Sequence, residues 1–184
     1  MIVDKNDLVL NEKELAKRMS GADISMAEKA VSQVREAMEP KYLMRKTEVL
    51  RVNHGIELGF GLIESENLKR NLKGCSHAYI VCATIGHGVD RLLRKVADLG
   101  AANQYLCDAA ASAMVESLVD YIEDTIPEKT KPRFAPGYGD FSIEMQEALL
   151  KYMRADNIGM GLTEKKLMIP QKSVTCIIGA IDEN

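Results

Sequence analysis

The sequence predicts an α+β fold in which a mostly antiparallel β-sheet is flanked by helices. Two apolar segments rich in β-branched residues, 77–85 and 173–181, are typical of core strands. Residues 42–63 alternate between apolar and polar side chains, as a β-hairpin does. Three other segments carry their apolar residues at helical spacing: 25–38, 101–124 and 143–155.

Length and composition indicate a protein with its own packed core. The 184 residues suit one domain, and 46% of them are hydrophobic, which is enough to bury a core. The formal net charge is −3 and no basic run stands out, so we expect neither a nucleic acid nor an anionic membrane as a partner. No apolar run approaches the ~20 residues of a membrane span, and the N-terminus lacks the apolar core of a signal peptide. We therefore expect a cytoplasmic protein with reduced, mostly buried cysteines.

The first part of the chain predicts two helices. Asn11 is placed to cap a short one. Ser25 followed by Glu28 has the spacing of a capping box and predicts the start of a longer one. We expect an N-terminal helical segment over residues 1–40 and the main domain over residues 41–184, in one compact unit overall.

The strands of the main domain are predicted from alternation and turn signals. Residues 42–52 and 56–63 should pair as a hairpin, because Asn-His-Gly between them is a turn signal. Residues 77–85 are apolar on both faces and are expected in the middle of the sheet. The last two strands are expected at 162–169 and 173–181.

A turn with two glycines, Gly86-His87-Gly88, follows the predicted central strand and precedes a helix predicted at 89–99. Such a turn presents unpaired N–H groups at a helix N-terminus, where an anion could bind. The G-x-G spacing is only part of a dinucleotide-binding fingerprint. The pattern therefore favours a structural turn over a ligand contact.

The helix predicted at 101–124 carries small residues beside one carboxylate. Ala109, Ser112 and Ala113 lie one and two turns before Glu116 on the same side. This arrangement leaves room for a ligand next to the carboxylate. The alternative, which the pattern alone favours, is close packing of the helix on the sheet with Glu116 at the solvent edge.

Residues 133–140, Arg-Phe-Ala-Pro-Gly-Tyr-Gly-Asp, form the least ordinary stretch of the chain. Pro136-Gly137 is a turn dipeptide, and glycine lets another molecule approach the backbone. Arg133 offers a fork of donors that suits a carboxylate or a phosphate, and Tyr138 offers a flat face and a hydroxyl. The stretch predicts a binding loop for a small molecule with an anionic end and a planar end. A surface turn with a salt-bridged arginine is the alternative.

The same stretch resembles the S-adenosylmethionine-binding motif of the activation domain of cobalamin-dependent methionine synthase. The motif is Arg-x-x-x-Gly-Tyr, here Arg133, Gly137 and Tyr138. With it, residues 100–178 align in outline with that domain. The further matching segments are 115–121, 161–164, 168–170 and 173–174.

Residues 83–91 and 132–141 are similar to the stand-alone activation subunit, which accompanies methionine synthases without a built-in domain. The resemblance implies an activation-domain-like fold and a role in reductive reactivation, in which S-adenosylmethionine methylates inactive cob(II)alamin after one-electron reduction. It implies a cobalamin-binding methionine synthase subunit as the partner and a flavodoxin-type protein as the reductant. Because cobalt is the nucleophile in that reaction, the chain is not expected to be catalytic alone, and no catalytic residue is assigned.

The resemblance also implies which residues contact S-adenosylmethionine. Arg133 and Glu116 contact its polar parts: the guanidinium suits the carboxylate, and the carboxylate of Glu116 suits the ammonium or the sulfonium. Ala135, Gly137 and Tyr138 supply backbone hydrogen bonds and a surface for the adenosine.

Two other functions stay open at this point. The family has a ligand-contacting tyrosine after the last matched strand, and this sequence ends at Asn184, before that position. A structural partner of a corrinoid methyltransferase that does not itself bind S-adenosylmethionine is therefore the alternative. A metal or redox site is less favoured, because the spacing fits no usual zinc pattern. Its ligands would come from Cys75, His77, Cys82, His87 and Cys107.

Overall fold

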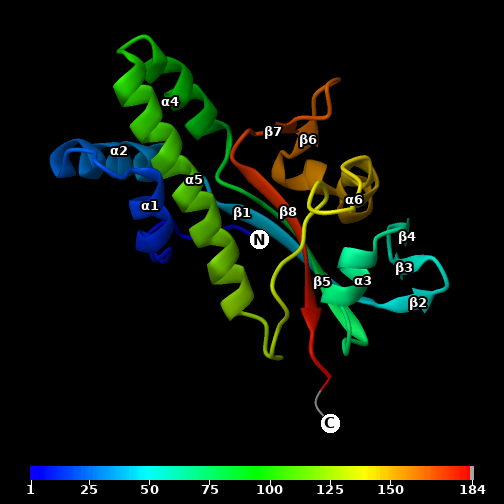
Figure 1. Cartoon of the computed structure of the whole chain (residues 1–184). Helices are drawn as coiled ribbons and strands as arrows, with labels where there is room; N and C mark the ends of the chain where they lie inside the picture. Colours follow the sequence, from blue (N-terminus) through cyan, green and yellow to red (C-terminus); the bar gives the residue numbers. More distant parts are fainter. Residues whose placement is uncertain (183–184) are drawn as a thin grey trace.

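Three antiparallel strands form the centre of the computed structural model, which describes residues 1–182 (Figure 1). β5 (His77–Thr84) lies in the middle, between β1 (Lys41–Glu48) and β8 (Ser173–Ala180). β5 is buried on both faces, as predicted for a central strand. The predicted combination of helices with an antiparallel sheet is thus confirmed.

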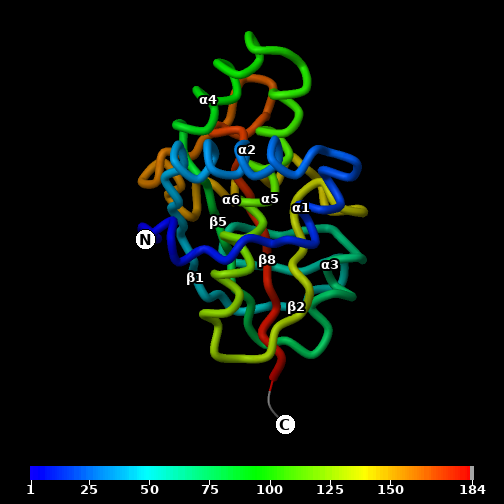
Figure 2. Tube along the Cα trace, turned by 90° about the vertical axis from the view of Figure 1, so that its left-hand side faces the viewer, coloured from blue at the N-terminus to red at the C-terminus, as the bar shows by residue number. Residues whose placement is uncertain are grey.

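A layer of helices covers one face of this sheet (Figure 1). Tyr79, Val81 and Ala83, alternate residues of β5, share a hydrophobic core with these helices. Figure 2 looks onto the layer, with α2 lying across the direction of the strands. The layer consists of α1 (Glu12–Arg18), α2 (Ile24–Ala37), α4 (His87–Ala97) and α5 (Ala101–Asp124).

Smaller elements cover the opposite face. Ile80 and Cys82 of β5 pack there against Leu149 and Met153 of α6. The elements of this side are β2 (Leu50–Val52), β3 (Gly55–Leu58), β4 (Gly61–Ile63), α3 (Glu66–Asn71), α6 (Met145–Met153), a 3₁₀ helix (Ala155–Ile158), β6 (Gly161–Leu162) and β7 (Met168–Ile169). The central sheet therefore separates two different layers, and the connection from α5 to α6 passes from one layer to the other (Figure 1).

The predicted hairpin forms only in part. β1 pairs with β5 along its whole length instead of with residues 56–63. The chain leaves the central sheet at Val49, whose N–H donates to the carbonyl of Ser76, and the hairpin is built from the short β2 and β3. Its turn lies where the Asn-His-Gly signal predicted it, with Val52 opposite Gly55.

Two other predictions at element ends were wrong. The second helix begins at Ile24, because Asp23 rather than Ser25 caps it by accepting a hydrogen bond from the Met26 N–H at 3.1 Å. Residues 162–169 do not form one strand. β6 and β7 instead pair with each other around a turn that is closed by the Thr163 N–H, which donates to the Leu167 carbonyl at 2.8 Å.

The N-terminal segment packs against the rest of the chain. Asn11 caps α1, as predicted, by accepting from the Glu14 N–H, and its own side chain donates to Asp120 of α5 at 2.7 Å. Leu8 and Val34 lie in the same core as α5. The division of the chain at residue 40 stays a prediction. Within residues 1–182, no helix combines the length and the apolarity that crossing a membrane requires.

The turn at Gly86–Gly88 has a packing reason. Gly86 has a φ of 87°, which favours glycine. A Cβ on Gly88 would lie 2.1 Å from the carbonyl oxygen of Ala37, so the start of α4 rests directly on the backbone at the end of α2. This close approach explains why residue 88 is a glycine. It supports the interpretation of Gly86-His87-Gly88 as a structural turn rather than a ligand contact.

We therefore expect Gly88→Ala to lower the free energy of unfolding by about 2–3 kcal/mol, because one backbone has to move away from the other. Without this contact, replacing glycine by alanine in a helix would raise the free energy of unfolding by about 1 kcal/mol. The sign of the measured change therefore shows whether the contact exists. Urea unfolding measures the change. Gly161→Ala is the matched control, since its Cβ would enter open space, and equal stability of the two variants would contradict the contact.

Candidate ligand-binding site

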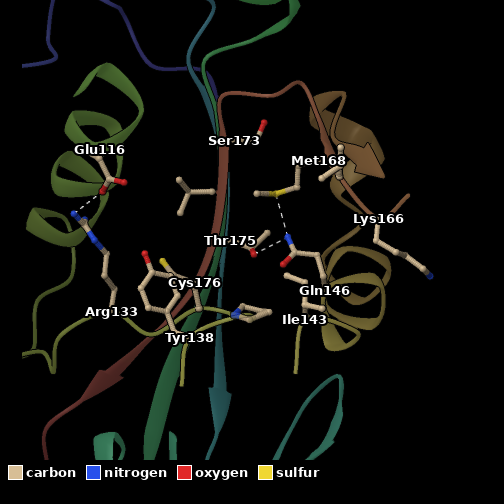
Figure 3. Close-up of a pocket in the computed structure, with 14 residues that line it drawn as sticks. Glu116, Arg133, Tyr138, Ile143, Gln146, Lys166, Met168, Ser173, Thr175 and Cys176 are labelled. Carbon is tan, nitrogen blue, oxygen red and sulfur yellow. Dashed lines mark hydrogen bonds and ion pairs between the residues drawn. The ribbon is translucent and has the colours of Figure 1, made fainter. Parts of the chain in front are cut away.

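A cavity of about 410 Å³ lies between α5, the 133–138 segment, α6 and the β6–β7 hairpin. Its volume is in the range of small-molecule sites. Figure 3 shows Glu116 and Arg133 on one side of β8 and Gln146 and Met168 on the other. The residues around it are Glu116, Arg133, Ala135, Pro136, Tyr138, Ile143, Gln146, Lys166, Leu167, Met168 and Ser173 to Cys176.

Four of the five predicted contact residues line this cavity: Glu116, Arg133, Ala135 and Tyr138. Gly137 does not line it. Its φ is 91°, and its N–H donates to the Phe141 carbonyl at 2.8 Å, so this residue shapes the loop. The fold thus brings Glu116 on the long helix next to the Arg133 stretch. Contact of these residues with a ligand stays a prediction.

Arg133 is surrounded by three carboxylates of α5. One terminal nitrogen lies 2.9 Å from Glu116, and the other lies 2.9 Å from Asp120 and 3.4 Å from Glu123. Their spacing of four and three residues places all three on one side of the helix. One positive and three negative formal charges leave a surplus of two negative charges in this cluster.

Burial and the ion pairs determine the pKa values in this cluster. Burial raises the pKa of Glu123 above its usual value, and the positive charge of Arg133 offsets only part of the rise. Burial alone would lower the pKa of Arg133, but Glu123, Glu116 and Asp120 together raise it. The guanidinium therefore stays charged, and both terminal nitrogens are already paired. The negative surplus suits a cation beside Glu116 better than a second anion beside Arg133.

The loop that carries Tyr138 is fixed at both ends. At its start, Phe134 and Ile177 exchange two backbone hydrogen bonds of 2.9 and 2.8 Å. At its end, the carboxylate of Asp140 accepts from the Ser65 hydroxyl at 2.5 Å, which lowers the pKa of Asp140. Between these points Phe141 is buried, while Tyr138 is 68% exposed at the cavity. The loop backbone is thus anchored at both ends, and the exposed side chain of Tyr138 lies at the cavity.

The opposite wall is polar at its base. Gln146 is buried, and its Nε2 donates to the Thr175 hydroxyl at 2.9 Å and lies 3.0 Å from the sulfur of Met168 (Figure 3). Lys166 on the β6–β7 hairpin pairs with Glu147 of α6, which ties the hairpin to that helix. Residues 173–176 of β8 form the floor between the walls.

Sequence reasoning missed part of this site. Asp120 and Glu123 could have been found, because they repeat the position of Glu116 at helical spacing. Gln146 and Thr175 carry no local signal. They meet only because α6 packs on the face of the sheet that carries the side chains of Cys82 and its strand partner Thr175.

The metal alternative gains no support from the geometry. Within residues 1–182, no group of three or more His, Cys, Asp or Glu side chains lies where it could hold a metal ion. Burial raises the pKa of all four cysteines, that of Cys82 to about 12, so these thiols stay protonated. They behave as core residues, and only Cys176 among them lines the cavity.

Together these features define an α+β protein with a ligand-sized cavity at one edge of an antiparallel sheet, next to a cluster of three carboxylates around Arg133. No protein-family model and no curated protein matches the sequence. Among solved structures, the chain is similar to the crystal structure of the MetH reactivation domain bound to AdoHcy, with a TM-score of 0.72. The match covers 100% of this chain and 78% of that chain at 13% sequence identity. At this identity it establishes the fold, and the activation-domain-like fold expected from the motif is confirmed.

Proposed function

We propose that the protein binds S-adenosylmethionine in this cavity and assists the reductive reactivation of a cobalamin-dependent methionine synthase. The observation that carries the proposal is the meeting of Glu116, Arg133, Ala135 and Tyr138 at one cavity. The fold is shared with a domain whose crystal structure holds AdoHcy, that is, S-adenosylhomocysteine. The resemblance of residues 133–138 to an S-adenosylmethionine-binding motif supports the same ligand.

The charges of the site fit this ligand class. S-adenosylmethionine carries a sulfonium and an α-ammonium, and the carboxylate cluster around Arg133 has a negative surplus. We expect Glu116 to lie next to one of these positive groups, because it is the carboxylate of the cluster that lines the cavity. Tyr138 and the apolar lining would cover the uncharged parts of the ligand.

In this role the residues of the chain bind and orient the methyl donor, and no proton transfer by the protein is required. Cobalamin, bound by the partner subunit, would supply the metal nucleophile. A flavodoxin-type protein is the proposed source of the electron. The proposal therefore needs a complex in which the mouth of the cavity faces the partner.

Isothermal titration calorimetry with S-adenosylmethionine and with S-adenosylhomocysteine tests the ligand. The titrations are repeated with the chain bound to a cobalamin-loaded methionine synthase. Binding of S-adenosylmethionine by the chain or by the complex is the expected result. A stable complex in which neither ligand binds this chain would overturn the proposal in favour of a purely structural partner.

Glu116→Gln is expected to weaken binding of S-adenosylmethionine by about tenfold and of S-adenosylhomocysteine by much less. The prediction places Glu116 next to the sulfonium, which only the first ligand has, whereas both ligands carry the ammonium. One nearby charge at a protein surface contributes about 1–2 kcal/mol. Asp124→Asn is the matched control, since it makes the same change of charge on an exposed residue of α5 outside the cavity. Equal losses for both ligands would place the sulfonium away from Glu116.

A further inference from the structure

β8 lies at an edge of the central sheet, and another part of the chain covers the second half of its outer side. Phe134 exchanges two backbone hydrogen bonds with Ile177. Further along, the Lys131 N–H donates to the Gly179 carbonyl and the Ile181 N–H donates to the Lys129 carbonyl, each at 2.8 Å. Residues 129–134 thus act as an irregular fourth strand against this half of β8.

The cover stops at Pro136. In the antiparallel register set by Phe134 and Ile177, the next hydrogen-bonded pair would join Pro136 to Thr175. Proline has no N–H to donate, and the chain turns away there, with the Tyr138 N–H donating to the Ala135 carbonyl at 3.1 Å. The backbone of Thr175 therefore lacks the partner that Ile177 has.

Strand alternation shows which groups are left open. Toward β5, the ladder uses every second residue, and it ends where the Ile85 N–H donates to the Lys172 carbonyl at 3.1 Å. Ser173 and Thr175 therefore direct their N–H and C=O groups to the outer side, as Ile177 does. No residue of the described range 1–182 forms a hydrogen bond with these groups.

These open groups face the cavity. Four consecutive residues of β8, 173–176, line it, although successive side chains of a strand point to opposite faces. The cavity therefore reaches the strand edge itself. Thr175 is only 2% exposed and Ser173 only 6%, so their backbone groups lie at the floor of the cavity. Buried N–H and C=O groups in folded proteins nearly always have partners, which indicates that a ligand or water supplies them here.

We propose that this open edge of β8 binds the adenine base of the ligand. Adenine presents a donor, its exocyclic amine, next to an acceptor, its neighbouring ring nitrogen. The C=O of Ser173 and the N–H of Thr175 offer the complementary acceptor and donor along one edge. The inference rests on the proposed function and deepens it, since it assigns the selectivity for adenine to the backbone of β8 and to the gap that Pro136 leaves.

The rest of the cavity fits this orientation. The carboxylate cluster lies on the α5 side, where Glu116 faces the cavity, and it suits the positively charged sulfonium and ammonium groups of the ligand. If the positive groups lie beside these carboxylates, the uncharged planar base lies at the other side of the cavity, next to the neutral edge of β8. Apolar side chains of Pro136, Ile143 and Leu167 are available to cover its faces.

The test compares S-adenosylhomocysteine with S-inosylhomocysteine, in which an oxygen replaces the exocyclic amine and the neighbouring ring nitrogen becomes a donor. We expect the inosyl ligand to bind at least about tenfold more weakly, because both hydrogen bonds are mismatched. In ¹H–¹⁵N NMR spectra, the adenosyl ligand should shift the Thr175 amide signal and slow its exchange with solvent. Homocysteine alone should leave that signal unchanged.

Two variants locate the selectivity on the backbone. Thr175→Pro removes the outward N–H without removing a bond of the β5–β8 ladder, and it should abolish the preference for the adenosyl ligand. Thr175→Val retains the N–H and loses only the hydroxyl, so it should keep the preference. Thermal unfolding reports whether each variant is folded. If the proline variant does not fold, the amide measurements on the parent protein decide whether adenine binds the backbone of Thr175.

Equal affinity of the parent for the two nucleoside ligands would overturn the inference. So would binding of S-adenosylhomocysteine without a change at the Thr175 amide, or a shift of that amide by homocysteine alone, which would place the amino-acid end at the edge. Failure of every adenosyl ligand to bind, both to the free chain and to its complex with methionine synthase, would instead overturn the proposed function.

Discussion

Phe141→Ala is expected to lower the free energy of unfolding by about 3–5 kcal/mol, the range for removing a buried aromatic side chain. Phe141 is 1% exposed and stacks on Phe134 with ring centroids 6.3 Å apart. It belongs to the core below α3 and the small sheet, so the substitution leaves a cavity directly under the 133–140 loop. Urea unfolding followed by circular dichroism measures the loss.

Tyr138→Ala is the matched comparison, because Tyr138 also lies against Phe134, with ring centroids 6.5 Å apart, but is mostly exposed. We expect less than about 1 kcal/mol of lost stability from it and a clear loss of ligand affinity. Phe141→Leu, which keeps most of the volume, should restore much of the stability. If Phe141→Ala were as stable as the parent, the loop would not depend on this core.

Arg133→Ala is expected to destabilise the protein by about 2 kcal/mol at neutral pH, because it leaves three partly buried carboxylates side by side without a cation. The figure is below that for a fully buried pair, since about a quarter of the Arg133 side chain is exposed. Lys69→Ala, which breaks an exposed pair with Glu66, should cost less than about 0.5 kcal/mol. Equal losses in the two variants would contradict the role of Arg133.

The loss in Arg133→Ala should depend on pH in a defined direction. The pKa of Glu123 is already raised by burial, and it rises further when the lowering influence of Arg133 is removed. A carboxyl group whose pKa is higher in the folded than in the unfolded state favours folding when protonated, and this contribution is lost as the pH rises through the folded pKa. The variant should therefore recover part of its stability as the pH is lowered from neutral toward about 4. A deficit that does not change over this range would exclude the charge explanation.

Elements with a strong local pattern could be predicted from the sequence. The helix at 101–124 was predicted with the bounds of α5, and the apolar segment that begins at His77 forms the central strand. Both are long enough for their periodicity to dominate. Element ends were less certain, because Asp23 and Ser25 both suit a helix N-terminus and only tertiary contacts select between them.

Only those features of the candidate site that lie within one continuous segment of the sequence could be predicted. The Arg133 stretch can be recognised from its unusual composition, an arginine followed by Pro-Gly, a tyrosine and a second glycine. Glu116 can be recognised because it lies on a stripe of small residues. The three-carboxylate cluster, the Gln146–Thr175 contact and the open edge of β8 depend on which segments meet in space. In particular, the sequence shows a proline at 136. It does not show that Pro136 lies opposite Thr175 of β8, where the missing N–H leaves the strand edge open.

A sheet edge with open N–H and C=O groups can recruit a strand from a neighbouring molecule and start aggregation. On β8, residues 129–134 occupy part of that edge, and the part at Ser173 to Thr175 lies at the floor of a cavity. That opening spans three residues at the floor of a cavity, so it offers a second copy less edge than the ~5–6 residues of an ordinary strand. At this edge of the sheet, the protein can therefore expose backbone to a small molecule while offering only a short template for polymerisation.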